Sequence, residues 1–152
     1  MSLKELLTQG SIKPHKTSRE EIGNLLDLVR RDIKDAKIGS ISTDRRFATA
    51  YNAVLQLATI IAYCKGYMPT ELGHHYTVFK AIRLIMGESY YDSAEYFDSC
   101  RAKRNITDYR HTGEISESET DELIKEAEKF LDVVLKFIKK YHPTLLKPQD
   151  NH

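Results

Sequence analysis

Residues 48–63 read ATAYNAVLQLATIIAY, and this stretch decides the fold. The pattern around it predicts a helix that starts near Thr43 or Asp44, runs to Lys65 and is closed by Gly66. The apolar surface of this helix is interrupted by four polar side chains: Thr49, Asn52, Gln56 and Thr59. A helix that is apolar on nearly every side must be covered by other helices, so we expect it at the centre of a bundle.

The segments on either side are amphipathic, as the outer helices of a bundle should be. Apolar residues recur at helical spacing between Ile22 and Ile33 and again between Leu123 and Ile138. Further helices are expected before Gly10, over 74–86 and from 91 to at least 104, and no window alternates as a strand would. The sequence therefore predicts an all-α fold, an antiparallel (up-and-down) bundle of four to five long helices plus a short N-terminal helix. We expect one domain over 1–142 and a flexible tail over 143–152.

The charges of the chain are nearly balanced, with 23 Lys and Arg residues against 22 Asp and Glu. This excludes the global basic field that draws proteins onto nucleic acid, so any RNA contact must come from a local patch. Cys64 and Cys100 lie in predicted helices without CxxC spacing, and we expect both to be buried and reduced. Residues 1–10 lack the apolar run of a signal peptide, and no stretch approaches the ~20 apolar residues of a membrane span. We expect a cytoplasmic protein with no membrane partner.

Candidate chemistry is concentrated in residues 101–111, which read RAKRNITDYRH. Because a helix turns by about 100° per residue, Arg104 and His111 lie within about 20° of one another around the axis, two turns apart. Arg101 and Asp108 lie on the same side. One helix face would then carry permanent cations, a carboxylate and an imidazole that can titrate near neutral pH.

This segment, together with the order and length of the helices, resembles the HEPN family. These are small helical bundles associated with prokaryotic nucleotidyltransferases and with RNA-cleaving toxins. The family's motif is an Arg, often followed by a polar residue, and a His after four to six intervening residues. Arg104 and Asn105, followed by His111, fit this motif with six. The Gly-His-His segment 73–75, which begins the helix after the central one, is also similar to the family.

The resemblance implies a metal-independent endoribonuclease that needs no cofactor and works as a homodimer, with the motifs of two protomers facing one cleft. It implies that Arg104 binds the scissile phosphate, His111 transfers protons and Asn105 orients the phosphate or the His. Three neighbouring side chains would contact the RNA substrate: Arg101, Tyr109 and Arg110. The expected setting is a toxin–antitoxin or nucleotidyltransferase-linked system.

Two other interpretations of this segment stay open. Tyr109 stands where a motif with four intervening residues would carry its His. This favours a catalytically inactive bundle that binds a partner protein such as a nucleotidyltransferase. On spacing alone, the basic residues of 101–111 also fit a solvated helix end, where cations interact favourably with the helix dipole.

Histidine and aromatic residues elsewhere in the chain predict less specific roles. His74 and His75 point about 100° apart on a helix and have no evident third ligand, so we predict no metal site. An aromatic group follows the next break: Tyr90, Tyr91, Tyr96 and Phe97. Such rings can stack on bases, but tyrosines at bundle ends usually bury the ring and leave the hydroxyl hydrated. We predict that this group belongs to the core or to a dimer interface.

Overall fold

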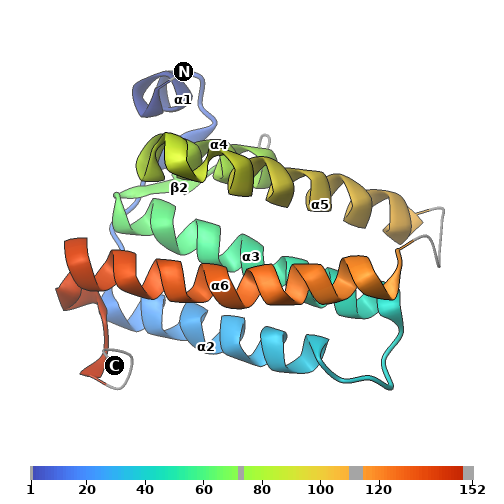
Figure 1. The fold of residues 1–152 in the computed structure, drawn as a ribbon. Helices are drawn as coiled ribbons and strands as arrows, with labels where there is room; N and C mark the ends of the chain where they lie inside the picture. Colours follow the sequence, from blue (N-terminus) through green and yellow to red (C-terminus); the bar gives the residue numbers. More distant parts are fainter. Residues whose placement is uncertain (1, 72–73, 110–114, 149–152) are drawn as a thin grey trace.

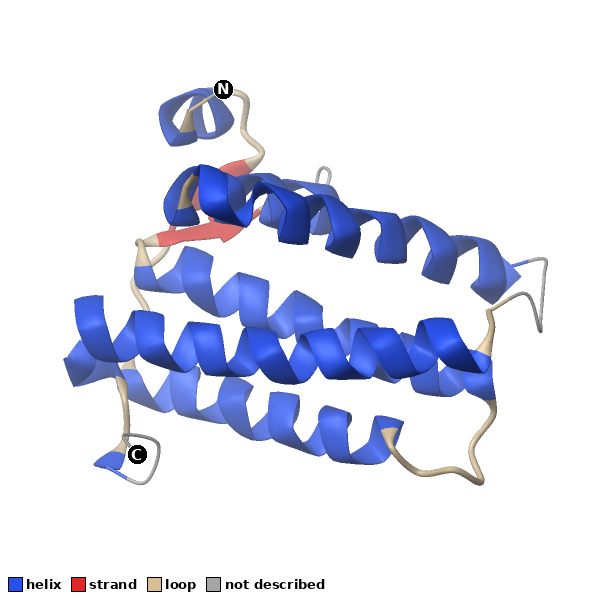
Figure 2. Ribbon diagram, viewed as in Figure 1, coloured by secondary structure: helices blue, strands red, loops and turns tan. Residues whose placement is uncertain are grey.

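The computed structural model describes residues 2–71, 74–109 and 115–148, without the side chains of 74 and 105–109. It confirms the predicted all-α bundle (Figures 1 and 2). A short helix is followed by five longer ones: α1 (Leu3–Thr8), α2 (Arg19–Ala36), α3 (Thr43–Cys64), α4 (His74–Met86), α5 (Tyr91–Tyr109) and α6 (Glu117–Tyr141). A 3-10 turn, η1 (Glu88–Tyr90), joins α4 to α5.

The central helix is α3, as its composition predicts. It packs against α2, α4, α5 and α6, and Figure 1 shows α2 and α6 on one side of it and α4 and α5 on the other. Four of its larger side chains are completely buried: Tyr51, Val54, Leu57 and Ile61. Burial of each large apolar side chain stabilises the fold by about 1.5–3 kcal/mol, so α3 contributes a large part of the hydrophobic stability.

The helix ends follow local rules that the sequence predicts. The hydroxyl of Ser18 accepts a hydrogen bond from the backbone N–H of Glu21 and begins α2. At the start of α6, Ser116 and Glu119 form a capping box, in which each side chain accepts a hydrogen bond from the other residue's backbone N–H. Gly66 follows α3 with a φ of 90°, a left-handed conformation that favours glycine.

A small antiparallel sheet corrects the expectation that the chain has no strand. In this sheet β1 (Ile12–Pro14) pairs with β2 (Tyr67–Pro69). Each strand has three residues, which is too short for an alternating pattern to be recognised. The sheet attaches α1 to the bundle, where Leu6, Ile12 and Ala81 form a second, smaller core.

His15 joins this sheet to the start of α2. Its Nε2 lies 2.7 Å from Oε1 of Glu21, and its ring centroid lies 4.4 Å from that of Tyr63. The hydroxyl of Thr17 donates to the same carboxylate oxygen at 2.7 Å. Although partial burial raises the pKa of Glu21, the hydrogen bonds from His15 and Thr17 outweigh it and hold this pKa below its ordinary 4.5. Glu21 is therefore the acceptor that connects the sheet to the bundle.

The C-terminal segment differs from the flexible tail expected after residue 142. A 3-10 turn, η2 (Pro143–Leu145), packs against α2 and α6, and Leu146 is buried. The side chain of Lys147 lies directly over Gly23, where an added Cβ would be 2.4 Å from Lys147 Cε. The burial of Leu146 and the packing of η2 against two helices make this segment part of the folded domain. The last four residues of the expected tail, 149–152, lie outside the described residues.

By length and composition alone, α3 is long and apolar enough to cross a membrane. This corrects the expectation that no stretch of the chain approaches the apolar length of a membrane span. In the structure 61% of its most apolar window is buried inside the bundle. Packing against four other helices therefore accounts for its apolar composition.

The cysteines and most of the aromatic group lie where the sequence predicts. Cys64 and Cys100 are buried and free, and burial raises the pKa of Cys64 to about 12 and that of Cys100 to about 11. Phe97 is buried, with its ring centroid 5.0 Å from that of Phe130, and Tyr90 and Tyr96 pack partly buried against the same core. Tyr91 lies outside this core, because 45% of its surface is exposed, and for it a dimer interface stays a prediction.

With Glu21 replaced by Gln, the protein should lose less stability on acidification than wild type does. Because the folded-state pKa of Glu21 is lowered, its carboxylate contributes stability above its unfolded pKa, and this contribution is lost as the pH falls through the folded value. Urea unfolding between about pH 5 and about pH 3 should show a shallower decline for Glu21→Gln than for wild type. The neighbouring, exposed Glu20→Gln is the matched control, and equal slopes for Glu21→Gln and wild type would contradict the connection.

Candidate functional site

Two cations of the predicted site, Arg101 and Arg104, lie one turn apart in the second half of α5. The Cζ atom of Arg104 lies 5.6 Å from the ring centroid of Tyr51 on α3. The Cζ atom of Arg101 lies 5.7 Å from the ring centroid of Tyr76 on α4. Both distances fall within the range of cation–π contact. The two guanidinium groups are therefore held against neighbouring helices and are partly buried.

The other residues predicted for the site fall at the edge of the described chain or beyond it. Asn105 and Tyr109 belong to α5, which stays helical to Tyr109, but their side chains lie outside the described residues. Arg110 and His111 lie outside them altogether. The alignment of Arg104 with His111 on one helix face stays a prediction.

Tyr51 is the buried polar group next to these cations. It is completely buried, and its hydroxyl oxygen lies 3.1 Å from Nδ1 of His75, in the first turn of α4. Its ring meets that of Phe79 edge-on, with 6.2 Å between the centroids. Burial raises the pKa of Tyr51 well above its ordinary 10.0, although the positive charges of Arg101 and Arg104 favour the ionised form. The hydroxyl is therefore protonated at neutral pH.

Three helices thus meet around Tyr51. Helix α3 supplies the phenol, α4 supplies the imidazole of His75, and α5 supplies the two guanidinium groups whose charges act on the phenol. Guanidinium and imidazole N–H groups are the donors that proteins use to bind phosphate and carboxylate. The chemistry available here is the recognition of an anion.

The surroundings of Arg101 include a carboxylate and an aromatic ring. The Nε of Arg101 donates to Oδ1 of Asp98 at 2.8 Å, and this hydrogen bond raises the pKa of Arg101. The ring of Tyr76 is shared between Arg101 and Lys80, whose Nζ lies 4.4 Å from the ring centroid. The carboxylate partly neutralises Arg101, so Arg101 contributes less to anion binding than an isolated guanidinium would.

Sequence reasoning misses Tyr51, and it notes His75 only as part of the Gly-His-His segment 73–75, without placing it at this site. Tyr51 could have been noticed because it places a hydroxyl on a helix that is apolar nearly all round. A buried hydroxyl needs an acceptor, so a polar partner is expected close to it. Which residue supplies the acceptor depends on how α4 packs on α3. The spacing of residues along the chain does not contain that information.

No group of three His, Cys, Asp or Glu side chains that could hold a metal ion occurs among the described residues. His75 is engaged with Tyr51 through Nδ1, and the side chain of His74 lies outside the described part of the chain. What the described residues around Tyr51 offer a ligand is the hydrogen-bond donors and positive charge of Arg101 and Arg104.

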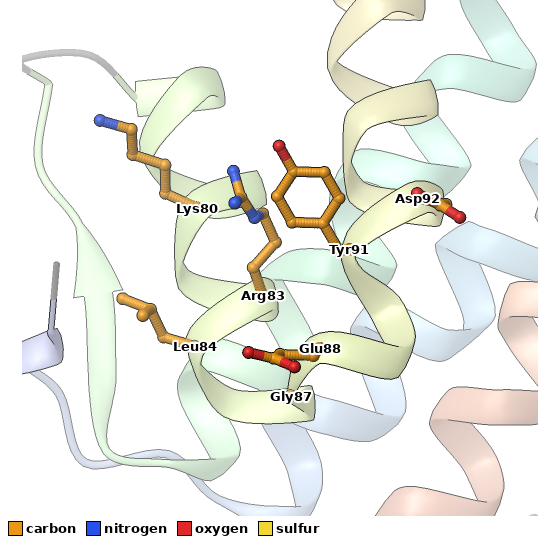
Figure 3. A pocket seen from close by; sticks show the side chains of 7 residues that line it. All are labelled: Lys80, Arg83, Leu84, Gly87, Glu88, Tyr91 and Asp92. Atoms are coloured by element: carbon orange, nitrogen blue, oxygen red, sulfur yellow. The ribbon is translucent and has the colours of Figure 1, made fainter.

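A separate hollow of about 660 Å³ opens between the C-terminal end of α4 and the start of α5 (Figure 3). Seven residues line it: Lys80, Arg83, Leu84, Gly87, Glu88, Tyr91 and Asp92. The Cζ of Arg83 lies 3.9 Å from the ring centroid of Tyr91, and Figure 3 shows the guanidinium beside that ring. Two acidic residues balance the two basic ones, so this surface lacks the positive charge that attracts RNA. Tyr and Arg, the residue types of the exposed Tyr91 and the partly exposed Arg83, are enriched at protein interfaces.

Comparison of the chain with protein-family models, with curated proteins and with solved structures finds no match. The resemblance to the HEPN family therefore rests on the order and length of the helices, on the Gly-His-His segment 73–75, and on Arg104, Asn105 and His111.

Replacing Tyr51 with Phe should reduce the loss of stability in alkali. The raised folded-state pKa means that the phenol contributes stability fully below its unfolded pKa near 10.0, and this contribution is lost as the pH rises above that value. The free energy of unfolding, measured in urea between about pH 9 and about pH 11, should fall less steeply in Tyr51→Phe than in wild type. Tyr141→Phe is the control, because Tyr141 is 58% exposed and should leave the slope unchanged. Identical slopes in Tyr51→Phe and wild type would show that the phenol is not buried.

Proposed function

We propose that this protein is a HEPN-like ribonuclease that cleaves RNA without a metal ion, through Arg104, Asn105 and His111. In this proposal it works as a homodimer in a toxin–antitoxin or nucleotidyltransferase-linked system. The observation that supports the proposal best is the position of Arg104, which is held against the buried ring of Tyr51 in the second half of α5.

A guanidinium group in this position suits the recognition of a phosphodiester. Arginine binds phosphate through two parallel N–H donors, and its charge is permanent at any physiological pH. Partial burial of Arg104 and the apolar core beneath it lower the local dielectric constant, which strengthens its interaction with an anion. A cation fixed before the substrate arrives also stabilises the charge that grows on the phosphate during the reaction.

The proposed reaction is an internal transfer of the phosphodiester. His111 removes the proton of the ribose 2′-hydroxyl, and the 2′ oxygen then attacks the phosphorus while the bond from phosphorus to the 5′ oxygen breaks. His111 of the second protomer donates a proton to the leaving 5′ oxygen. The products are a 2′,3′-cyclic phosphate and a 5′-hydroxyl. Arg104 binds the phosphate and Asn105 orients it, and three further side chains contact the RNA: Arg101, Tyr109 and Arg110.

A second function is supported by a different observation, the hollow between α4 and α5 (Figure 3). Its balanced charges and its exposed Leu84 and Tyr91 suit a protein surface better than a nucleic acid. In this alternative the bundle is catalytically inactive and binds a partner protein, such as a nucleotidyltransferase, through this hollow.

Purified wild-type protein should cleave single-stranded RNA in the presence of EDTA. Arg104→Ala and His111→Ala should each slow cleavage by about 10²- to 10³-fold, because the first removes charge stabilisation and the second removes proton transfer. Gel electrophoresis of end-labelled RNA measures the rates and identifies the cyclic phosphate. Arg19→Ala, which removes an exposed guanidinium at the start of α2, should keep the wild-type rate. Intact RNA, or a monomeric mass in light scattering at micromolar concentration, would contradict the dimeric nuclease.

The partner-binding alternative makes a separate prediction. A nucleotidyltransferase encoded next to this protein should bind it in isothermal titration calorimetry, and Tyr91→Ala should weaken binding about tenfold or more, since Tyr anchors carry much of an interface's affinity. Tyr141→Ala removes a ring of similar exposure away from the hollow and is the control. Equal affinities for Tyr91→Ala and wild type would exclude the hollow as the docking surface.

A further inference from the structure

The hydrogen bond between Tyr51 and His75 fixes an imidazole next to the cationic end of α5. The reaction proposed above uses Arg104 and His111 and leaves this imidazole without a role. His75 is partly buried in the first turn of α4, and its ring centroid lies 5.8 Å from that of Tyr51. The ring centroid of Tyr51 also lies 5.6 Å from the Cζ of Arg104. One buried ring therefore holds both the imidazole and the guanidinium in place.

The chemistry of Tyr51 determines which nitrogen of His75 carries the proton. The phenol is completely buried and stays protonated, because burial raises the pKa of Tyr51. A buried O–H must donate a hydrogen bond, and Nδ1 of His75 is 3.1 Å away. If Nδ1 is the acceptor, the neutral imidazole carries its hydrogen on Nε2. Nε2 is then a donor, on the opposite side of the ring from the buried phenol.

We propose that His75 is a further substrate-binding residue of this site, whose Nε2–H donates to a non-bridging phosphate oxygen of the RNA that Arg104 binds. Tyr51 is its positioning residue, since it holds the ring in this tautomer and orientation. The proposal deepens the ribonuclease function and rests on it. It names a second phosphate contact that comes from α4 and not from the α5 segment 101–111.

A neutral donor has a specific advantage at this position. Negative charge grows on the non-bridging oxygens as the 2′ oxygen attacks, and donors already aimed at that charge stabilise it at no cost of reorganisation. The imidazole of His75 gains and loses no proton in this role. It therefore differs from His111, whose role requires proton transfer. A glutamine, whose Nε2 amide donates from a similar position, should replace His75 in part.

Cleavage kinetics with paired variants test this role. In His75→Ala the kcat should fall about 10²-fold, whereas His75→Gln should recover at least tenfold of that loss with the same pH profile as wild type. Circular dichroism and thermal unfolding check that both variants are folded. Equal losses in the two variants would overturn the donor role, because a proton-transfer residue or a structural residue would not be rescued by glutamine. Wild-type rates in His75→Ala would overturn the inference while the ribonuclease function stands.

A second measurement does not depend on cleavage. Nitrogen-15 NMR of wild-type protein should show His75 neutral, with hydrogen on Nε2. In Tyr51→Phe this preference for the Nε2–H tautomer should be lost, because no phenol donates to Nδ1. Titration with inorganic phosphate should shift the Nε2 signal of His75 in wild type and should shift it much less in Arg104→Ala. If RNA stays intact but phosphate shifts this signal, the ribonuclease function fails while the phosphate contact stands. If the hydrogen is on Nδ1, or phosphate leaves the signal unchanged, the inference fails.

Discussion

A phenolic hydroxyl buried at the centre of an apolar bundle must have a hydrogen-bond partner, and the rest of this site depends on that requirement. Tyr51 lies on the central helix α3 and is completely buried. Leaving its hydroxyl without an acceptor would cost about 1–3 kcal/mol. His75 meets the requirement from the first turn of α4, so the start of α4 is held in one place on α3. The ring of Tyr51 in turn supports the guanidinium of Arg104 on α5. A single buried group thus relates three helices to one another.

Much of the fold is predictable from the sequence because it follows from local rules. The apolar surface of residues 48–63 requires burial, and the periodicity of α2 and α6 provides the faces that bury it. Ser18 and Ser116 mark helix starts through capping bonds that act over three residues. The features that the sequence does not predict depend on distant contacts. The strands of the small sheet have three residues each, and the packing of the C-terminal segment depends on contacts of η2 with α2 and α6, which are distant in the chain.

The same distinction explains what could be predicted of the site. Arg101 and Arg104 stand out because they lie together in one short, basic segment of a helix. Tyr51 and His75 are 24 residues apart in the chain, and although His75 belongs to the Gly-His-His segment 73–75, nothing in the sequence pairs it with Tyr51. Their relationship exists only after α4 folds back onto α3. A motif read along one helix therefore identifies the cations of a site, whereas the groups that position them come from helices that only tertiary packing brings near.

The central claim is that Arg104 and the imidazole held by Tyr51 bind one anion. A crystal structure of the protein with bound tungstate, a heavy and easily located analogue of phosphate, tests it most directly. The account predicts a tungstate ion within about 3 Å of both the Arg104 guanidinium and Nε2 of His75, with the bond from Tyr51 to Nδ1 intact. Tungstate bound only elsewhere on the molecule, or a His75 ring turned away from Tyr51, would contradict it.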